Sequence, residues 1–318
     1  MRILFVCSGN AGEISVLIRN QSQSLINKNI EIDYFIVKGK GLTGYLKNLL
    51  KLRKKFKSEK YDIVHAHYSF CGYLCVLANI KPLIVSLMGS DVKSKRIYRI
   101  YNKILLNYSC SALIVKSKEL GESLNFKKIH IIPNGVNLEN FREKNKPECI
   151  EKLKWNPDKI NLIFGGSPER PEKNYKLAND VIKKFNDPLI VVHFLKDIPQ
   201  NELTNYYSAA DGLIISSLWE GSPNVVKEAM ACNLPIISTN VGDVEHLFGN
   251  LSGHFLSSSD SNDYFLKFQE FIDYVKNNQK PRTEGLKQVI KLGLNEEEIA
   301  DKIIKIYKSI KNVSNSDK

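Results

Sequence analysis

Short apolar runs alternate with amphipathic stretches along the whole chain. In the first half, six runs have the length of a buried strand, and they lie at 3–7, 30–37, 62–66, 83–87, 112–115 and 129–132. Several of the stretches between them, such as 95–108, repeat apolar residues at helical spacing. Strands that alternate with helices at this interval predict an α/β protein with a doubly wound parallel sheet, which binds ligands at the carboxyl ends of its strands.

The same alternation begins again after a charged segment. Residues 139–158 have weak periodicity and contain Pro147 and Pro157, so we expect a linker there. The strands expected in the second half lie at 162–165, 189–195, 212–215, 234–238 and 253–256. These patterns predict a first domain at 1–145, a second domain at 146–294, and a C-terminal helix at 295–318 that packs back on the first domain.

Length and composition are those of a globular protein with two domains. The chain has 318 residues, of which 43% are hydrophobic. No apolar run approaches the ~20 residues that a membrane-spanning helix needs. The first apolar run is too short for a signal peptide and the six cysteines form no Cys-x-x-Cys pair, so we expect cytoplasmic residence with reduced thiols.

Positive charge is concentrated in the first half. Residues 1–150 contain 25 Lys and Arg against 11 Asp and Glu, so their net charge is +14. Because the whole chain has a net charge of +12, residues 151–318 have a net charge of −2. Two basic segments, 47–57 and 93–103, interleave cations with large apolar side chains. Nucleic acid and an anionic membrane surface are the usual partners of such a half. No nucleic-acid-binding motif is present, so the sequence favours peripheral binding to the inner face of a membrane and no nucleic acid.

The most informative stretch is 216–245. An apolar strand ends at Ser216, a turn with Gly221 and Pro223 follows, and a helix then begins. Its first N–H groups are free at the carboxyl end of a strand, which makes an anion site. Glu220 in the turn and Glu228 in the helix can accept hydrogen bonds from hydroxyl groups. The combination suits a nucleotide diphosphate sugar, although a strand–turn–helix unit with solvated acids would show the same Glu-x7-Glu spacing.

The full string SSLWEGSPNVVKEAMACNLPIISTNVGDVE closely resembles the donor-site signature of the family 4 retaining glycosyltransferases. IIPNGVN at 131–137 resembles the loop that ends the first domain of these enzymes. The resemblance implies the GT-B fold, in which two doubly wound Rossmann-like domains face each other across a cleft.

The resemblance also implies roles for residues of the second half. Glu228 would accept hydrogen bonds from the ribose hydroxyls, and Glu220 would accept them from the hexose hydroxyls. Lys173 matches the lysine that neutralises the donor diphosphate, but Ser167 stands where the family has an arginine, so Arg170 takes the paired role here. The remaining donor-binding candidates are backbone groups of the two loops, with the Asn224 side chain: Gly166, Gly221, Ser222, Pro223, Asn224, Val225 and Val226.

The first half offers looser candidates. Gly9, Asn10 and Gly12 lie in the first strand–helix loop, where a donor or acceptor contact and a simple turn are equally compatible with two glycines. His67 ends a strand and is a catalytic candidate beside the sugar, whereas its neighbour His65 fits a core position.

The loop after the fourth strand departs from the family pattern. Met88 occupies the position where many relatives have a histidine, and Asp91 is either an acceptor contact or a helix cap. Whatever the usual histidine does must therefore be absent or be done by other groups.

The sequence therefore predicts a retaining, metal-independent hexosyltransferase. The nucleotide diphosphate sugar, which we expect to be UDP-linked, serves as co-substrate, and no cofactor is expected. The acceptor would be a saccharide or a lipid-linked precursor of a surface polysaccharide. No Asp-x-Asp motif for a divalent ion is present. The alternatives are a GT-B sugar-nucleotide epimerase or a phosphorylase, and a nucleotide-sugar-binding protein without catalysis, which Met88 favours.

Overall fold

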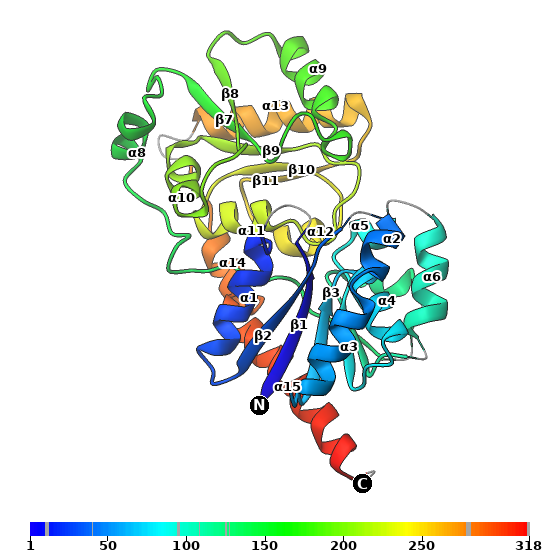
Figure 1. Ribbon diagram of the computed structural model, residues 1–318. Coiled ribbons are helices and arrows are strands. Elements are labelled where there is room, and N and C mark those ends of the chain that lie inside the picture. The colour runs from blue at the N-terminus through cyan, green and yellow to red at the C-terminus, as the bar shows by residue number, and fades with distance from the viewer. Residues whose placement is uncertain are drawn as a thin grey trace. The chain divides into compact units, whose positions relative to one another are not determined.

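The computed structural model describes residues 1–9, 13–39, 41–93, 96–107, 109–124, 126, 128–277 and 281–316. The chain divides into two compact units. The first consists of Met1–Gly135 together with Glu296–Lys318, and the second is Val136–Asn295 (Figure 1).

The first unit is built on a six-stranded sheet in which every pairing is parallel. Its order is β2-β1-β3-β4-β5-β6. The strands are β1 (Arg2–Ser8), β2 (Glu31–Val37), β3 (Ile63–His67), β4 (Leu83–Ser86), β5 (Ala112–Val115) and β6 (Ile129–Ile131). Each lies within two residues of a predicted strand. The fully buried strands β3, β4 and β5 read as apolar runs, whereas the edge strand β2 alternates apolar and polar residues.

Alternate side chains along the strands of this sheet pack into two separate hydrophobic cores, one on each face. Leu4 and Val6 of β1 pack with α3 (Leu49–Ser58), α4 (Ser69–Leu77), α6 (Arg96–Leu106) and α7 (Lys118–Glu122). Ile3 and Phe5 pack on the opposite face with α1 (Val16–Ile26) and α15 (Glu296–Ser316) (Figure 1). The period of two along a strand produces this division. The C-terminal helix α15 thus completes the core of the first unit.

The second unit repeats the plan with five parallel strands in the order β11-β10-β9-β7-β8. They are β7 (Ile160–Phe164), β8 (Ile190–Phe194), β9 (Gly212–Ile215), β10 (Ile236–Thr239) and β11 (His254–Ser257). Helices α9 (Tyr175–Phe185) and α13 (Ser261–Asn277) cover one face. The other face is covered by α10 (Gln200–Ala209), α11 (Asn224–Ala231), α12 (Val244–Phe248) and α14 (Gly285–Lys291).

The segment 139–158, expected as a linker, contains a helix. Asn145 caps α8 (Lys146–Leu153) by accepting a hydrogen bond from the Glu148 N–H at 3.3 Å, and Pro147 lies in its first turn. Asn, Pro and Glu in this order are a helix-start signal that overrides weak periodicity. The chain passes from the first unit to the second between Gly135 and Val136, ten residues before the boundary placed from the sequence.

The two points where the chain changes units are adjacent. Val136 forms a parallel bridge with Asn295, and its N–H donates to the Leu294 carbonyl at 2.8 Å. Gly135 lies so close to Glu296 that a Cβ at position 135 would approach the Glu296 Cα to 2.7 Å. Packing against Glu296 therefore explains the glycine at position 135.

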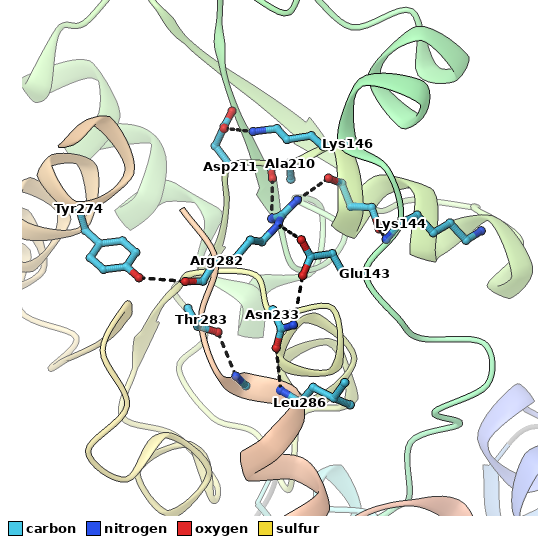
Figure 2. Close-up of polar contacts among 12 residues, drawn as sticks. Glu143, Lys144, Lys146, Ala210, Asp211, Asn233, Tyr274, Arg282, Thr283 and Leu286 are labelled. Atoms are coloured by element: carbon cyan, nitrogen blue, oxygen red, sulfur yellow. Dashed lines mark hydrogen bonds and ion pairs between the residues drawn. The ribbon is translucent and has the colours of Figure 1, made fainter. Parts of the chain in front are cut away.

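Arg282 links three segments of the second unit by hydrogen bonds and an ion pair. Its guanidinium donates to the carbonyl of Ala210 at 3.1 Å and to that of Ser208, which end α10, and it pairs with Glu143 at 3.3 Å (Figure 2). Glu143 also accepts from Asn233 at 3.1 Å, and Asn233 receives the Leu286 N–H at 3.0 Å. The guanidinium thus satisfies carbonyls that a helix end leaves open.

We predict that Arg282→Ala destabilises the second unit. It leaves two largely buried carbonyls and Glu143 without a partner, which should lower the free energy of unfolding by about 2–3 kcal/mol. Chemical denaturation measures the loss. Lys287→Ala is the control, because its pair with Glu284 is exposed and should be worth less than about 0.5 kcal/mol. Equal effects of the two variants would contradict the role given to Arg282.

Candidate functional site

Two loops meet where the order of the second sheet reverses. Strand β7 lies between β8 and β9, so the loop after β7, 165–174, and the loop after β9, 216–223, leave neighbouring strands at the same edge. Their helices α9 and α11 pack on opposite faces of the sheet. Such a switch point, at the carboxyl ends of parallel strands, is where doubly wound sheets bind ligands.

Lys173 and Glu220 join these two loops. The Lys173 Nζ lies 2.6 Å from the Glu220 Oε1, and their side chains are only 11% and 18% exposed. The Ser217 hydroxyl donates to the same carboxylate oxygen at 2.9 Å. A charge-assisted bond in a sheltered place is strong and directional. The structure thus brings together the cation and the acid that the family resemblance assigns to the diphosphate and to the hexose.

Backbone contacts fix the distance between the loops. The Ser216 hydroxyl donates to the carbonyls of Lys173 and Asn174, each at 3.0 Å. The Leu218 N–H donates to the Glu172 carbonyl at 2.8 Å. Ser216 is fully buried, so these bonds are shielded from water and Lys173 is held at the edge of β9.

The start of α11 offers unused N–H groups. Pro223 at the cap position has no side-chain capping bond, and its carbonyl accepts from Val226 at 3.2 Å. Within the part of the chain that the structure describes, no acceptor lies against the N–H groups of Gly221, Ser222, Asn224 and Val225. These N–H groups and the helix dipole favour an anion. The Val226 N–H, also a donor-binding candidate, is already engaged within the turn.

Two more candidates differ in how firmly they are held. The buried Glu228 accepts a hydrogen bond from the Tyr207 hydroxyl at 2.9 Å, and burial raises the pKa of Tyr207 well above its usual value. Arg170, by contrast, is 60% exposed and forms an ion pair with Glu172 two residues away. Of the two cations predicted for the diphosphate, only Lys173 is fixed by contacts to the other loop.

Glycines allow the close approach of these loops. A Cβ at Gly166 would lie 2.9–3.1 Å from the side-chain carbons of Lys173, so the glycine leaves room for the lysine stem. Gly242, with φ of 63°, lies against Gly221, whose carbonyl oxygen would be 2.6 Å from a Cβ at position 242. The loop after β10 therefore packs directly on the turn that precedes α11.

Two further polar residues of this region, Lys227 and Asp243, were not among the predicted site residues. Lys227 is fully buried and donates to the Ser222 hydroxyl at 3.0 Å, and Ser222 donates to the Asp243 carboxylate at 2.6 Å. Ser222 was chosen only for its backbone. The signal in the sequence was a lysine within the apolar face Val226–Ala231, with an aspartate in the next loop.

In the first unit, His67 is buried in an aromatic stack. It stacks on His65 with centroids 4.3 Å apart and lies 4.4 Å from Phe5. Among the described residues, neither ring nitrogen of His67 has a hydrogen-bond partner, whereas His65 bonds to Tyr307 at 2.6 Å and to Ser86 at 2.8 Å. Burial lowers the pKa of His65 to about 3 and the pKa of His67 well below 6.5. Both rings are therefore neutral at physiological pH.

Asp91 holds loops together. Its buried carboxylate accepts three backbone N–H groups, from Ser69, Met88 and Gly89, each at 2.9 Å. Burial raises the pKa of this carboxyl despite these bonds. Asp91 thus caps α4, the helix that follows the neighbouring strand, and its full burial keeps the carboxylate away from solvent.

The candidates of the first loop, which are Gly12 for donor binding and Gly9 and Asn10 for the acceptor side, are only partly described. Gly9 donates to the Val37 carbonyl at 2.9 Å, and a Cβ there would lie 2.2 Å from an Ile36 methyl group, so packing explains this glycine. Asn10 and Gly12 lie outside the described residues. Among the residues that are described, no three His, Cys, Asp or Glu side chains converge as a metal site would need.

Two family models match consecutive parts of the chain. "Glycosyltransferase Family 4" matches residues 11–140, and "Glycosyl transferases group 1" matches residues 139–273. The matches meet near the point where the chain passes from the first unit to the second.

Named relatives and a solved structure agree with these matches. An Escherichia coli UDP-Gal:alpha-D-GlcNAc-diphosphoundecaprenol alpha-1,3-galactosyltransferase is 27% identical over 70% of this chain and 68% of its own length. A putative teichuronic acid biosynthesis glycosyltransferase of Bacillus subtilis is 27% identical over 59% of this chain and 55% of its own length. The Anabaena protein Alr3699/HepE, solved with UDP and glucose, superposes with a TM-score of 0.77 at 16% identity, over 97% of this chain and 100% of that one. This last likeness concerns the fold, and the predicted GT-B fold is confirmed.

We predict that the buried histidines make stability depend on acid. An unfolded histidine titrates near pH 6.5, whereas His67 stays neutral in the fold, so the unfolded state binds more protons as the pH falls below 6.5. Between pH 7 and pH 5 each such histidine should lower the free energy of unfolding by about 2 kcal/mol.

The variant His67→Phe tests this, because the ring fits beside Phe5 and no hydrogen bond of His67 is lost. Denaturation at pH 7 and pH 5 should show a smaller acid loss for His67→Phe than for wild type. His246→Gln, at an exposed position, should keep the wild-type loss. An unchanged acid loss in His67→Phe would contradict the prediction.

Proposed function

Because the chain belongs to the family 4, group 1 glycosyltransferases of the GT-B fold, we propose that it moves a hexose from a UDP-linked donor to a saccharide or lipid-linked acceptor with retention of configuration. The observation that carries the proposal is the pair of Lys173 and Glu220 across the switch point of the second sheet, beside free N–H groups. Opposite charges and a helix start at one edge suit the two ends of a sugar diphosphate.

In this proposal the sites act on different parts of the donor. The N–H groups of Gly221, Ser222, Asn224 and Val225 bind the diphosphate, and Lys173 neutralises the charge that grows on it as the bond to the sugar breaks. Glu220 accepts hydrogen bonds from hydroxyls of the hexose. Glu228, which is held by Tyr207, accepts hydrogen bonds from the hydroxyls of the ribose. No metal ion is needed in this scheme, because the lysine and the N–H groups carry the charge of the leaving group.

The reaction itself follows a front-face course. The acceptor hydroxyl oxygen bonds to the anomeric carbon on the side from which the diphosphate leaves, the bond from that carbon to phosphate oxygen breaks, and the diphosphate takes the acceptor proton. Configuration at the anomeric carbon is thereby retained. The Escherichia coli relative, which is named for galactose transfer to a lipid-linked sugar, and the teichuronic acid relative support an acceptor in cell-surface polysaccharide synthesis.

One observation favours a second candidate, a nucleotide-sugar-binding protein without catalysis. Met88 cannot donate a strong hydrogen bond or titrate. Slow release of free sugar from the bound donor separates the two candidates, because a transferase hydrolyses its donor slowly when no acceptor is present and a simple binder does not.

We predict that Lys173→Ala lowers donor turnover by a factor of about 10²–10³, the usual effect of removing one group that stabilises transition-state charge. Release of UDP from UDP-hexose measures it, with circular dichroism as the check on folding. Arg170→Ala is the matched control: its guanidinium is exposed and paired with Glu172, so its loss should be at least tenfold smaller. Near-normal turnover in Lys173→Ala would overturn the proposed donor site.

Basic and apolar side chains on the first unit support a membrane contact of the enzyme. Helix α3 exposes Lys51, Lys54 and Leu50, which is 75% exposed, and α6 exposes Lys103 and Ile104, which is 61% exposed. Both helices pack against α4. Among the described residues, none of the helices is both long and apolar enough to cross a bilayer. We propose peripheral attachment to the anionic inner face of a membrane, where a lipid-linked acceptor would be met.

We predict that the protein floats with phosphatidylglycerol vesicles at moderate ionic strength and not with neutral vesicles. Each lysine near such a surface contributes about 1 kcal/mol. Leu50→Glu combined with Ile104→Glu should abolish flotation, because both changes place a negative charge on the contact. Leu266→Glu, at a similarly exposed leucine of the second unit, should leave flotation intact. Equal binding to neutral vesicles, or no binding at all, would refute the membrane contact.

A further inference from the structure

Lys227 is a fully buried lysine that is hydrogen-bonded to Ser222 of the candidate site. It lies in α11, one residue before Glu228, and its neighbours Val226 and Ala229 are also fully buried. Its Nζ donates to the Ser222 hydroxyl at 3.0 Å, and that hydroxyl donates to the Asp243 Oδ2 at 2.6 Å. One chain of hydrogen bonds therefore joins α11 to the turn after β9 and to the loop after β10.

Two carboxylates, those of Asp243 and Glu228, interact electrostatically with the Lys227 ammonium group. The Asp243 Oδ1 is buried and has no hydrogen-bond partner among the described residues, and burial raises the pKa of this carboxyl. The attraction of Lys227 opposes that shift. Glu228 is a second carboxylate whose charge acts on the lysine. Burial lowers the pKa of Lys227 to about 8, so that the side chain is still mostly a cation at neutral pH.

Asp243 is bonded to Ser222, in the turn whose N–H groups the proposed function assigns to a diphosphate, and Glu228 lies in the helix that follows this turn. Two carboxylates in a sheltered place repel a polyanion, because the effective dielectric there is low. A cation one hydrogen bond away from Ser222 removes this repulsion. The same bond holds the turn that presents the N–H groups of Gly221 and Ser222.

We propose that Lys227 is a positioning residue for the nucleotide diphosphate: it neutralises Asp243 and Glu228 and, through Ser222, fixes the turn 220–224 for anion binding. The inference rests on the proposed function and adds a specific electrostatic task to it. A lysine that served only as a structural counter-ion would affect folding, whereas this one affects the phosphate part of the ligand in particular.

Binding of UDP and of uridine to four proteins tests the assignment: wild type, Lys227→Met, Asp243→Asn and the double variant. Lys227→Met should weaken UDP binding at least tenfold more than uridine binding, because a charge-assisted contact is worth about one to two decades in affinity. Adding Asp243→Asn should recover most of the loss, since it removes the carboxylate left unpaired. Lys152→Met, which removes an exposed lysine from the same unit, should behave as wild type.

The double variant also keeps the test valid if Lys227→Met does not fold, because it removes both members of a buried charge pair together. If it then binds UDP as wild type does relative to uridine, the assignment is supported, and if it has lost the preference for UDP, the assignment is wrong. Equal weakening of UDP and uridine by Lys227→Met, or no weakening, would also overturn it. Absence of UDP binding to wild type would instead overturn the proposed donor site itself.

Discussion

The order of the strands in the second sheet is the constraint on which the candidate site depends. Strand β7 is flanked by β8 on one side and by β9 on the other, so the helices that follow β7 and β9 must cover opposite faces. The two loops therefore leave neighbouring strands at one edge of the sheet, which is where doubly wound sheets bind ligands. Lys173 and Glu220, which are far apart in the sequence, face each other there because of this topology and not because of any local pattern.

The site is assembled from groups whose burial would be costly if they were alone. Lys173 is paired with Glu220, Glu228 with the Tyr207 hydroxyl, and Lys227 with Ser222. Each partner lowers the cost of removing a charge from water. The N–H groups of the turn before α11 add positive potential without adding a mobile charge. Donors held in place before the ligand arrives stabilise developing charge at no cost of reorganisation, which is the property that a departing diphosphate requires.

The sequence predicts the strands better than the contacts between loops. All strands of both sheets were expected within two or three residues, because buried parallel strands are apolar runs between punctuating turns. The helix at 146–153 was missed, since its charged turns mask the period while its capping residues Asn145 and Pro147 mark its start. The chain of hydrogen bonds from Lys227 through Ser222 to Asp243 was also missed. It depends on the packing of Gly242 against Gly221, and a three-dimensional contact of this kind has no counterpart in spacing along the chain.

The groups at the ends of β3 and β4 bear on how the acceptor proton leaves. A general base works best when its pKa lies near the operating pH. His67 does not meet this condition, because burial holds its pKa well below 6.5, and Met88 has no proton to exchange. The carboxylate of Asp91 is occupied by three backbone N–H groups. At these two strand ends, neither His67 nor Met88 therefore supplies a base near neutral pH. A departing diphosphate that accepts the proton itself removes the need for one, and this chemistry agrees with a donor site built to bind and hold that phosphate.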